Sequence, residues 1–114
     1  MNVTSESVGG VTVIRIAGEL RDSNQREFVE AVRGHLDAGR PRVALEFSGL
    51  TYVSSAGLGA IVHVTAQANT RGGRVVLAAP SPFLTGVLEA TRLNRYFELF
   101  PDVNAAVAAL SQQP

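Results

Sequence analysis

Two adjacent serines, Ser54 and Ser55, have the residue type and position with the clearest capacity for chemistry. They lie between an extended apolar run and a helical one, in Val53-Ser54-Ser55-Ala56-Gly57-Leu58-Gly59. A helix start leaves backbone N–H groups unpaired and carries a partial positive charge, so it favours a capping hydroxyl and tolerates a phosphate. Ser54 is interpreted as a cap or a neighbour. For Ser55 two interpretations stay open, a helix cap and a phosphorylation site.

A serine nucleophile is a third possibility, in a hydrolase. The two histidines of the chain are His35 and His63, and His63 stands eight residues after Ser55. That spacing is about 12 Å along one helix, beyond hydrogen-bond reach unless the helix breaks. The glycine expected two residues before a nucleophile-elbow serine is absent, as are a glycine-rich phosphate loop, metal-spaced histidines and paired carboxylates. We therefore expect no enzyme, no metal and no cofactor.

Composition limits the partners. The 114 residues contain ten basic and ten acidic side chains and no cysteine. This length fits one domain, residues 1–114, and no basic cluster indicates nucleic-acid binding. No run approaches the ~20 apolar residues of a membrane span, and no secretory signal opens the chain. We expect a soluble, cytoplasmic protein.

The first half of the chain predicts a hairpin, a helix and a central strand. Strands are expected over residues 2–8 and 11–17, joined by a turn at Gly9-Gly10. Asp22 is interpreted as a helix cap rather than a partner contact, with Gln25 three residues on. The helix that follows has one apolar face and is ended by Gly39 and Pro41; this face consists of Phe28, Ala31, Val32 and Leu36. The strand over residues 42–53 is interrupted at Ser48-Gly49.

The second half predicts three more helices and two strands. From Gly57 a helix is expected whose face comprises Leu58, Ile61, Val62, Thr65 and Ala68 or Asn69. Strands are expected over residues 74–78 and 96–100. Ser81, followed by Pro82, caps one helix, and Asp102 caps the last one. Residues 84, 87, 88 and 91 form the apolar face of the first of these helices, and residues 103, 106, 107 and 110 that of the second. Residues 111–114 are expected to fray.

The predicted order is ββαβαβαβα, an α/β single domain. We expect a mixed sheet with an antiparallel N-terminal strand and four helices packed on it. Recognition in such sheets is usual at the carboxyl ends of strands, where Ser54 and Ser55 lie. The turn Arg21-Asp22-Ser23, which follows the preceding strand, is expected next to them.

Residues 43–59, Val-Ala-Leu-Glu-Phe-Ser-Gly-Leu-Thr-Tyr-Val-Ser-Ser-Ala-Gly-Leu-Gly, resemble the signature of STAS domains, especially the bacterial anti-sigma factor antagonists. The resemblance covers almost the whole chain. Ile16-Ala17-Gly18-Glu19-Leu20 is similar to the second strand of the family, and the segment from Leu93 to Phe100, followed by an alanine-rich helix, also fits. The resemblance thus implies a STAS-like fold.

The resemblance also implies a binding module rather than an enzyme. Unphosphorylated antagonists of this kind bind an anti-sigma factor that is also a serine kinase, and thereby free a sigma factor. The kinase switches them off by phosphorylating a serine at the start of the second helix, here Ser55, and a phosphatase of the metal-dependent class restores binding. We expect a partner-binding surface formed by Arg21, Asp22, Ser23, Ser54, Ser55, Ala56, Gly57 and Leu58. Leu58 is either a partner anchor or a core residue.

This chain differs from many members of the family near the serine. Ser54 stands where they have an aspartate, Ala56 where they have Ser or Thr, and Arg21 directly follows Gly-Glu-Leu where they also have an aspartate. A competing interpretation is an adaptor subunit that is not phosphorylated, as in a lipid-transport or stressosome-type complex, with Ser55 only a cap. A serine hydrolase is the third.

Overall fold

The computed structural model describes residues 1–112. Its elements are, in order, β1 (Asn2–Val8), β2 (Val11–Leu20), α1 (Gln25–Asp37), β3 (Arg42–Glu46), β4 (Leu50–Val53), α2 (Ser55–Thr70), β5 (Arg74–Ala78), α3 (Pro82–Thr91), a short 3₁₀ helix (Leu93–Arg95), β6 (Leu99–Phe100) and α4 (Val103–Ser111).

The N-terminal hairpin confirms the predicted antiparallel start. β1 and β2 pair with Val8 opposite Val11, which leaves Gly9 and Gly10 as a two-residue turn. Both glycines have positive φ, 56° and 81°, the conformation that a type I′ hairpin turn requires. The turn therefore sets the register of the longest strand pair in the domain.

The strands form one mixed sheet in the order β1-β2-β3-β5-β6, and all pairs except β1-β2 are parallel. The central strand predicted over residues 42–53 is divided: β3 pairs with β2 and β5, whereas β4 pairs with a later part of β2. The division occurs beside Gly18, whose φ is 96° and whose N–H donates to the Gly49 oxygen at 2.8 Å. The first part of β2 thus pairs with β3, and its last part pairs with β4.

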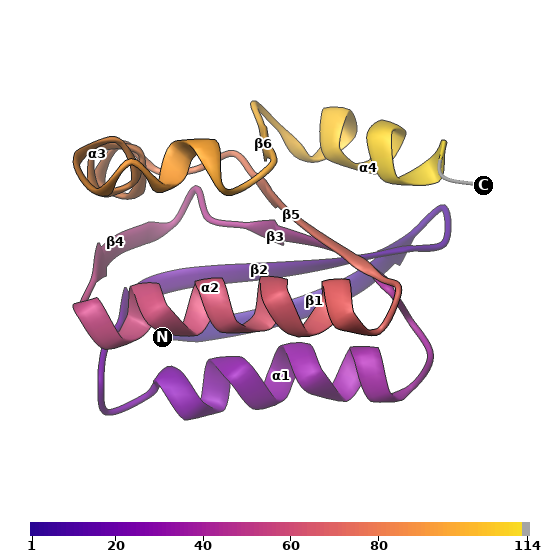
Figure 1. Cartoon of the computed structure of the whole chain (residues 1–114), viewed down its shortest axis with the longest axis horizontal. Coiled ribbons are helices and arrows are strands. Elements are labelled where there is room, and N and C mark those ends of the chain that lie inside the picture. Colours follow the sequence, from indigo (N-terminus) through magenta and orange to yellow (C-terminus); the bar gives the residue numbers. More distant parts are fainter. Residues whose placement is uncertain (113–114) are drawn as a thin grey trace.

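Helices cover both faces of the sheet (Figure 1). α1 and α2 lie side by side on one face, and α3 and α4 lie on the other. The larger core includes Phe28 of α1 and Phe47, whose ring centroids are 6.3 Å apart. A second core joins α4, through Ala106 and Leu110, to the opposite face of the sheet. The four predicted helices are confirmed.

The α2 helix is rotated relative to the predicted face. Its buried residues are Gly57, Ala60, Ile61, Val64, Thr65 and Ala68. Leu58 and Val62 are only half-buried, and Asn69 is exposed. Small residues at the contact let the helix lie close against its neighbours. The prediction places large apolar side chains on the buried face and therefore misses these small residues.

Two other expectations differ from the structure. The predicted strand over residues 96–100 forms only at Leu99–Phe100, because the 3₁₀ helix and the turn after it occupy the segment before. α4 continues to Ser111 with Gln112 as its C-cap, although both residues are expected from the sequence to fray; residues 113–114 of that expectation lie outside the described residues. The predicted caps Ser81 and Asp102 are confirmed, since their side chains accept from the N–H groups of Leu84 and Ala105.

Candidate partner-binding site around Ser55

The pairing of β4 with β2 brings the two halves of the predicted site together. Leu20 is the register partner of Val53, and the Leu20 carbonyl oxygen accepts a hydrogen bond from the Ser54 N–H at 2.9 Å. The turn that begins at Arg21 therefore lies beside the start of α2. This confirms the expected proximity of the two segments, which are more than thirty positions apart in the sequence.

The two serines have different structural roles. Ser54 is the N-cap of α2: its backbone is extended, with φ −82° and ψ 171°, and its Oγ accepts from the Gly57 N–H at 3.1 Å. Ser55 is the first helical residue, is exposed, and its hydroxyl makes no hydrogen bond to any residue of the described range 1–112. The interpretation of Ser55 as the helix cap is therefore wrong.

This division of roles makes a prediction about stability. Ser54→Ala removes the cap hydrogen bond and should lower the free energy of unfolding by about 1 kcal/mol. Ser55→Ala removes a solvated hydroxyl and should change it by less than about 0.5 kcal/mol. Urea denaturation of the two variants, followed by circular dichroism, makes the comparison. Equal losses would show that the hydroxyls share the capping role.

Gly57 allows the close approach between the two segments. It is buried, and a Cβ at this position would lie 2.6 Å from the Leu20 carbonyl oxygen and 2.9 Å from the Leu20 Cγ. Gly59, two residues later, has no atom within 4 Å of its hypothetical Cβ. Gly57 therefore lets the start of α2 lie close to the end of β2, and it does not itself form part of the exposed surface.

The turn before α1 is organised by Asn24. Its Oδ1 accepts from the Arg21 N–H at 2.8 Å, and its Nδ2 donates to the Glu19 carbonyl oxygen at 2.9 Å. Asn24 occupies the N-cap position of α1, so the prediction that Asp22 caps this helix is wrong. Asp22 and Ser23 are exposed at the tip of the turn. Neither side chain therefore has the capping role predicted for Asp22.

Arg21 joins an aromatic cluster that the sequence did not reveal. Its guanidinium carbon lies 4.3 Å from the centre of the Tyr52 ring, and its Nε lies 2.6 Å from Glu19 Oε1. The Tyr52 ring is in turn 5.5 Å from that of Phe83, which is 40% exposed. The hydrogen bond from Arg21 lowers the pKa of the Glu19 carboxyl. The turn after β2, strand β4 and helix α3 thus contribute a cation and two partly exposed rings to one cluster, and Tyr52 lies two positions before Ser54.

The remaining predicted contact residues divide between surface and core. Ala56 is exposed, whereas Leu58 is half-buried and packs against the larger core. The first turn of α2 contains no acidic residue. A phosphate on Ser55 would therefore meet the positive end of the helix without a carboxylate in the same turn.

The structure gives no support to a nucleophilic Ser55. α2 is continuous from Ser55 to Thr70, so His63 stays about 12 Å further along the helix axis. Within residues 1–112 no group of three His, Cys, Asp or Glu side chains is arranged to hold a metal ion.

In the same residues, no helix has both the length and the apolar character needed to cross a membrane.

The fold and this site define a STAS domain. A family model described as "Mlab, STAS domain" matches residues 3–101, and the chain belongs to this family. It is similar to BtrV of Bordetella bronchiseptica, a candidate anti-sigma factor antagonist by name, with 28% identity over 109 residues that cover 96% of this chain and 91% of that protein.

Solved structures show the same fold. A candidate anti-sigma factor antagonist of Thermotoga maritima superposes with a TM-score of 0.89 at 23% identity and covers 96% of this chain and 95% of its own. SpoIIAA in its unphosphorylated form gives a TM-score of 0.74 at 19% identity, covering 98% and 100%. Bacillus SpoIIAA in its phosphorylated form gives 0.73 at 20% identity, covering 95% and 98%.

Proposed function

We propose that this protein is an anti-sigma factor antagonist that works in the cytoplasm as a binding module rather than an enzyme. Unphosphorylated, it binds an anti-sigma factor through the surface around Ser55, and a sigma factor is released. The anti-sigma factor is also a serine kinase, and phosphorylation of Ser55 ends the interaction. A phosphatase of the metal-dependent class restores it.

The observation that carries this proposal is the separation of the two hydroxyls. Ser54 Oγ is committed to the Gly57 N–H, whereas the Ser55 hydroxyl is exposed and unbonded within residues 1–112. A kinase can thus reach Ser55 without opening the helix start. The name of BtrV supports the same function, and SpoIIAA, a protein of the same fold, has been solved in a phosphorylated form.

The surface around Ser55 has features suited to a protein partner. Arg21 stacks on Tyr52, and the exposed Phe83 continues the apolar area. Arginine and aromatic side chains are enriched among the residues that dominate binding energy at protein interfaces. We include Tyr52 and Phe83 in the proposed contact surface, together with Arg21, Asp22, Ser23, Ser55, Ala56 and Leu58.

The direct test is phosphorylation with candidate anti-sigma kinases and ATP. We expect one phosphate, located on Ser55 by mass spectrometry, and none on the Ser55→Ala variant. Ser54→Ala is the matched control, because it removes the neighbouring hydroxyl and should keep Ser55 modifiable. If the Ser55→Ala variant were still phosphorylated, at Ser54, the assignment of the phosphorylation site to Ser55 would be wrong.

Two other functions predict different results in the same experiments. An adaptor subunit that is not phosphorylated would take up no phosphate from any candidate kinase. A serine hydrolase would react at Ser55 with a serine-directed acylating probe in the folded protein, whereas the proposed antagonist would not.

A further inference from the structure

A polar pocket lies at the opposite end of the domain from Ser55. It has a volume of about 330 Å³ and is lined by Ser5, Glu6 and Ser7 of β1, Thr12 of β2, His35 of α1, and Arg40. Thr12 and Leu20 are eight residues apart on β2, about 26 Å at the rise of a strand. The pocket is therefore separate from the surface proposed to bind the anti-sigma factor.

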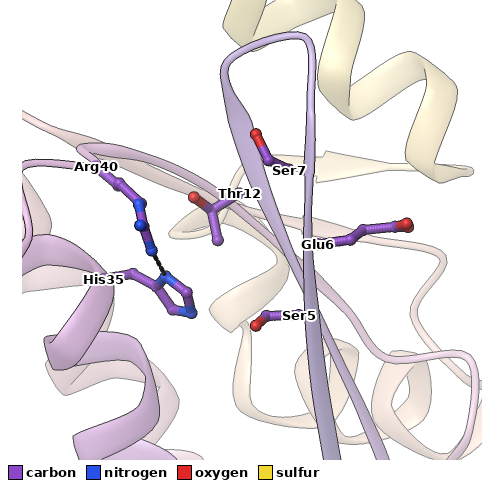
Figure 2. Close-up of a pocket in the computed structure, with 6 residues that line it drawn as sticks. All are labelled: Ser5, Glu6, Ser7, Thr12, His35 and Arg40. Atoms are coloured by element: carbon purple, nitrogen blue, oxygen red, sulfur yellow. Dashed lines mark hydrogen bonds between the residues drawn. The ribbon is translucent and has the colours of Figure 1, made fainter.

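The side chains of this pocket are mostly hydrogen-bond donors. Figure 2 shows Ser5, Ser7 and Thr12 on the same side of the hairpin as His35 and Arg40, whereas Glu6 extends to the other side. Three hydroxyls and one guanidinium thus face the space, whereas Glu6, which also lines the pocket, has its carboxylate paired with Arg15.

Thr12 is the side chain that points most clearly to a ligand. The residue is only 4% exposed, yet its hydroxyl lines the pocket and has no hydrogen-bond partner in the described part of the chain. Solvent reaches this hydroxyl through the pocket, since Gln67 Oε1 is the only fully buried side-chain oxygen or nitrogen without a partner in residues 1–112. A polar molecule in the pocket would replace that solvent as the hydrogen-bond partner of Thr12.

His35 adds a further donor. Arg40 Nη1 lies 3.1 Å from His35 Nδ1, and because a guanidinium only donates, Nδ1 accepts this bond. Burial, and to a lesser extent the Arg40 charge, lower the pKa of His35, which favours the neutral ring. In the neutral ring with Nδ1 accepting, Nε2 carries the proton and donates.

We propose that this pocket binds a phosphate group, either inorganic phosphate or the phosphate of a small organic phosphate ester. The guanidinium of Arg40 supplies the charge and the planar donor fork that suit phosphate oxygens. Ser5, Ser7, Thr12 and the His35 Nε2–H supply uncharged donors around it. The volume leaves room for an organic part beside the phosphate.

The test is a titration of the full chain with inorganic phosphate, in which NMR measures the amide chemical shifts at each step. Chloride is the compensating ion that keeps the ionic strength constant. We expect saturable shifts at residues 5–7, 12, 35 and 40. A parallel titration with glycerol phosphate distinguishes an ester ligand from the free ion, since the ester should bind more tightly if the remaining volume is used. Equal or stronger competition by acetate would overturn the assignment to phosphate.

Variants locate the interaction. Arg40→Gln should weaken phosphate binding by at least about tenfold. Thr12→Val keeps shape and strand propensity and should weaken binding severalfold. Arg95→Gln, an equal change in charge on the 3₁₀ helix, should leave binding unchanged, and so should Ser55→Ala. Shifts that do not saturate, or equal effects of Arg40→Gln and Arg95→Gln, would contradict a specific site and reveal only general attraction of anions.

Discussion

Gly57→Ala should lower the free energy of unfolding by about 2 kcal/mol or more, because the new methyl group has no space. Its carbon would lie 2.6 Å from the Leu20 carbonyl oxygen and 3.0 Å from Val53 Cγ2. The oxygen cannot move away alone, since it also accepts the hydrogen bond from the Ser54 N–H. The start of α2 must therefore shift from the end of β2. Urea denaturation monitored by circular dichroism measures the loss.

Gly59→Ala is the matched control on the same helix. Its methyl group would meet no atom within 4 Å, and the residue is exposed in the helix interior. Alanine is the better helix former by about 0.8–1.0 kcal/mol, so this variant should be slightly more stable than the parent. If both glycines responded alike, the close contact at Gly57 would not be the cause.

Phosphorylation of Ser55 should abolish partner binding while the domain stays folded. The phosphate adds nearly two negative charges at the positive end of α2, which should stabilise the helix by a fraction of a kcal/mol to about 2 kcal/mol. In the middle of an interface the same group must be desolvated, and a loss of ~4 kcal/mol weakens binding about a thousandfold. Calorimetry with the phosphorylated and unphosphorylated chains against the anti-sigma factor gives both affinities.

Single substitutions separate charge from other effects of modification. Ser55→Asp should bind poorly and resist unfolding as well as the parent, and Ser55→Ala should bind persistently in the presence of kinase and ATP. Ala66→Asp introduces the same charge on an exposed position of α2 about 16 Å further along, and should leave affinity unchanged. Equal affinities of Ser55→Asp and Ser55→Ala would favour the unphosphorylated adaptor.

Local signals were sufficient for most of the fold. Gly9-Gly10 predicts the hairpin because both residues need positive φ, and Ser81 and Asp102 predict helix starts because each cap acts within three residues of sequence. The first helix shows where such signals fail. Asp22, Ser23 and Asn24 are all capping residue types, but Asn24 occupies the N-cap position and makes no cap hydrogen bond, because its side-chain amide bridges Arg21 and Glu19 instead.

The candidate site depended partly on contacts that no local pattern reveals. The position of Ser55 follows from sequence, since an apolar strand and a helix meet there. The contacts of Arg21 with Tyr52 and of Tyr52 with Phe83 require three separate segments to meet. They also require the strand predicted over residues 42–53 to divide, so that β4 pairs with the end of β2. The donors of the hairpin pocket are likewise collected from β1, β2 and α1. Each of these arrangements depends on tertiary pairing and carries no periodic signal.

The exposed Ser55 hydroxyl also offers an attachment point. The chain contains no cysteine, so Ser55→Cys would create its only thiol. Because Ser54 holds the helix start, a label at position 55 should leave the fold intact. A photoreactive group on this thiol would form a covalent bond with whichever protein covers the start of α2, and the bonded partner could then be identified directly.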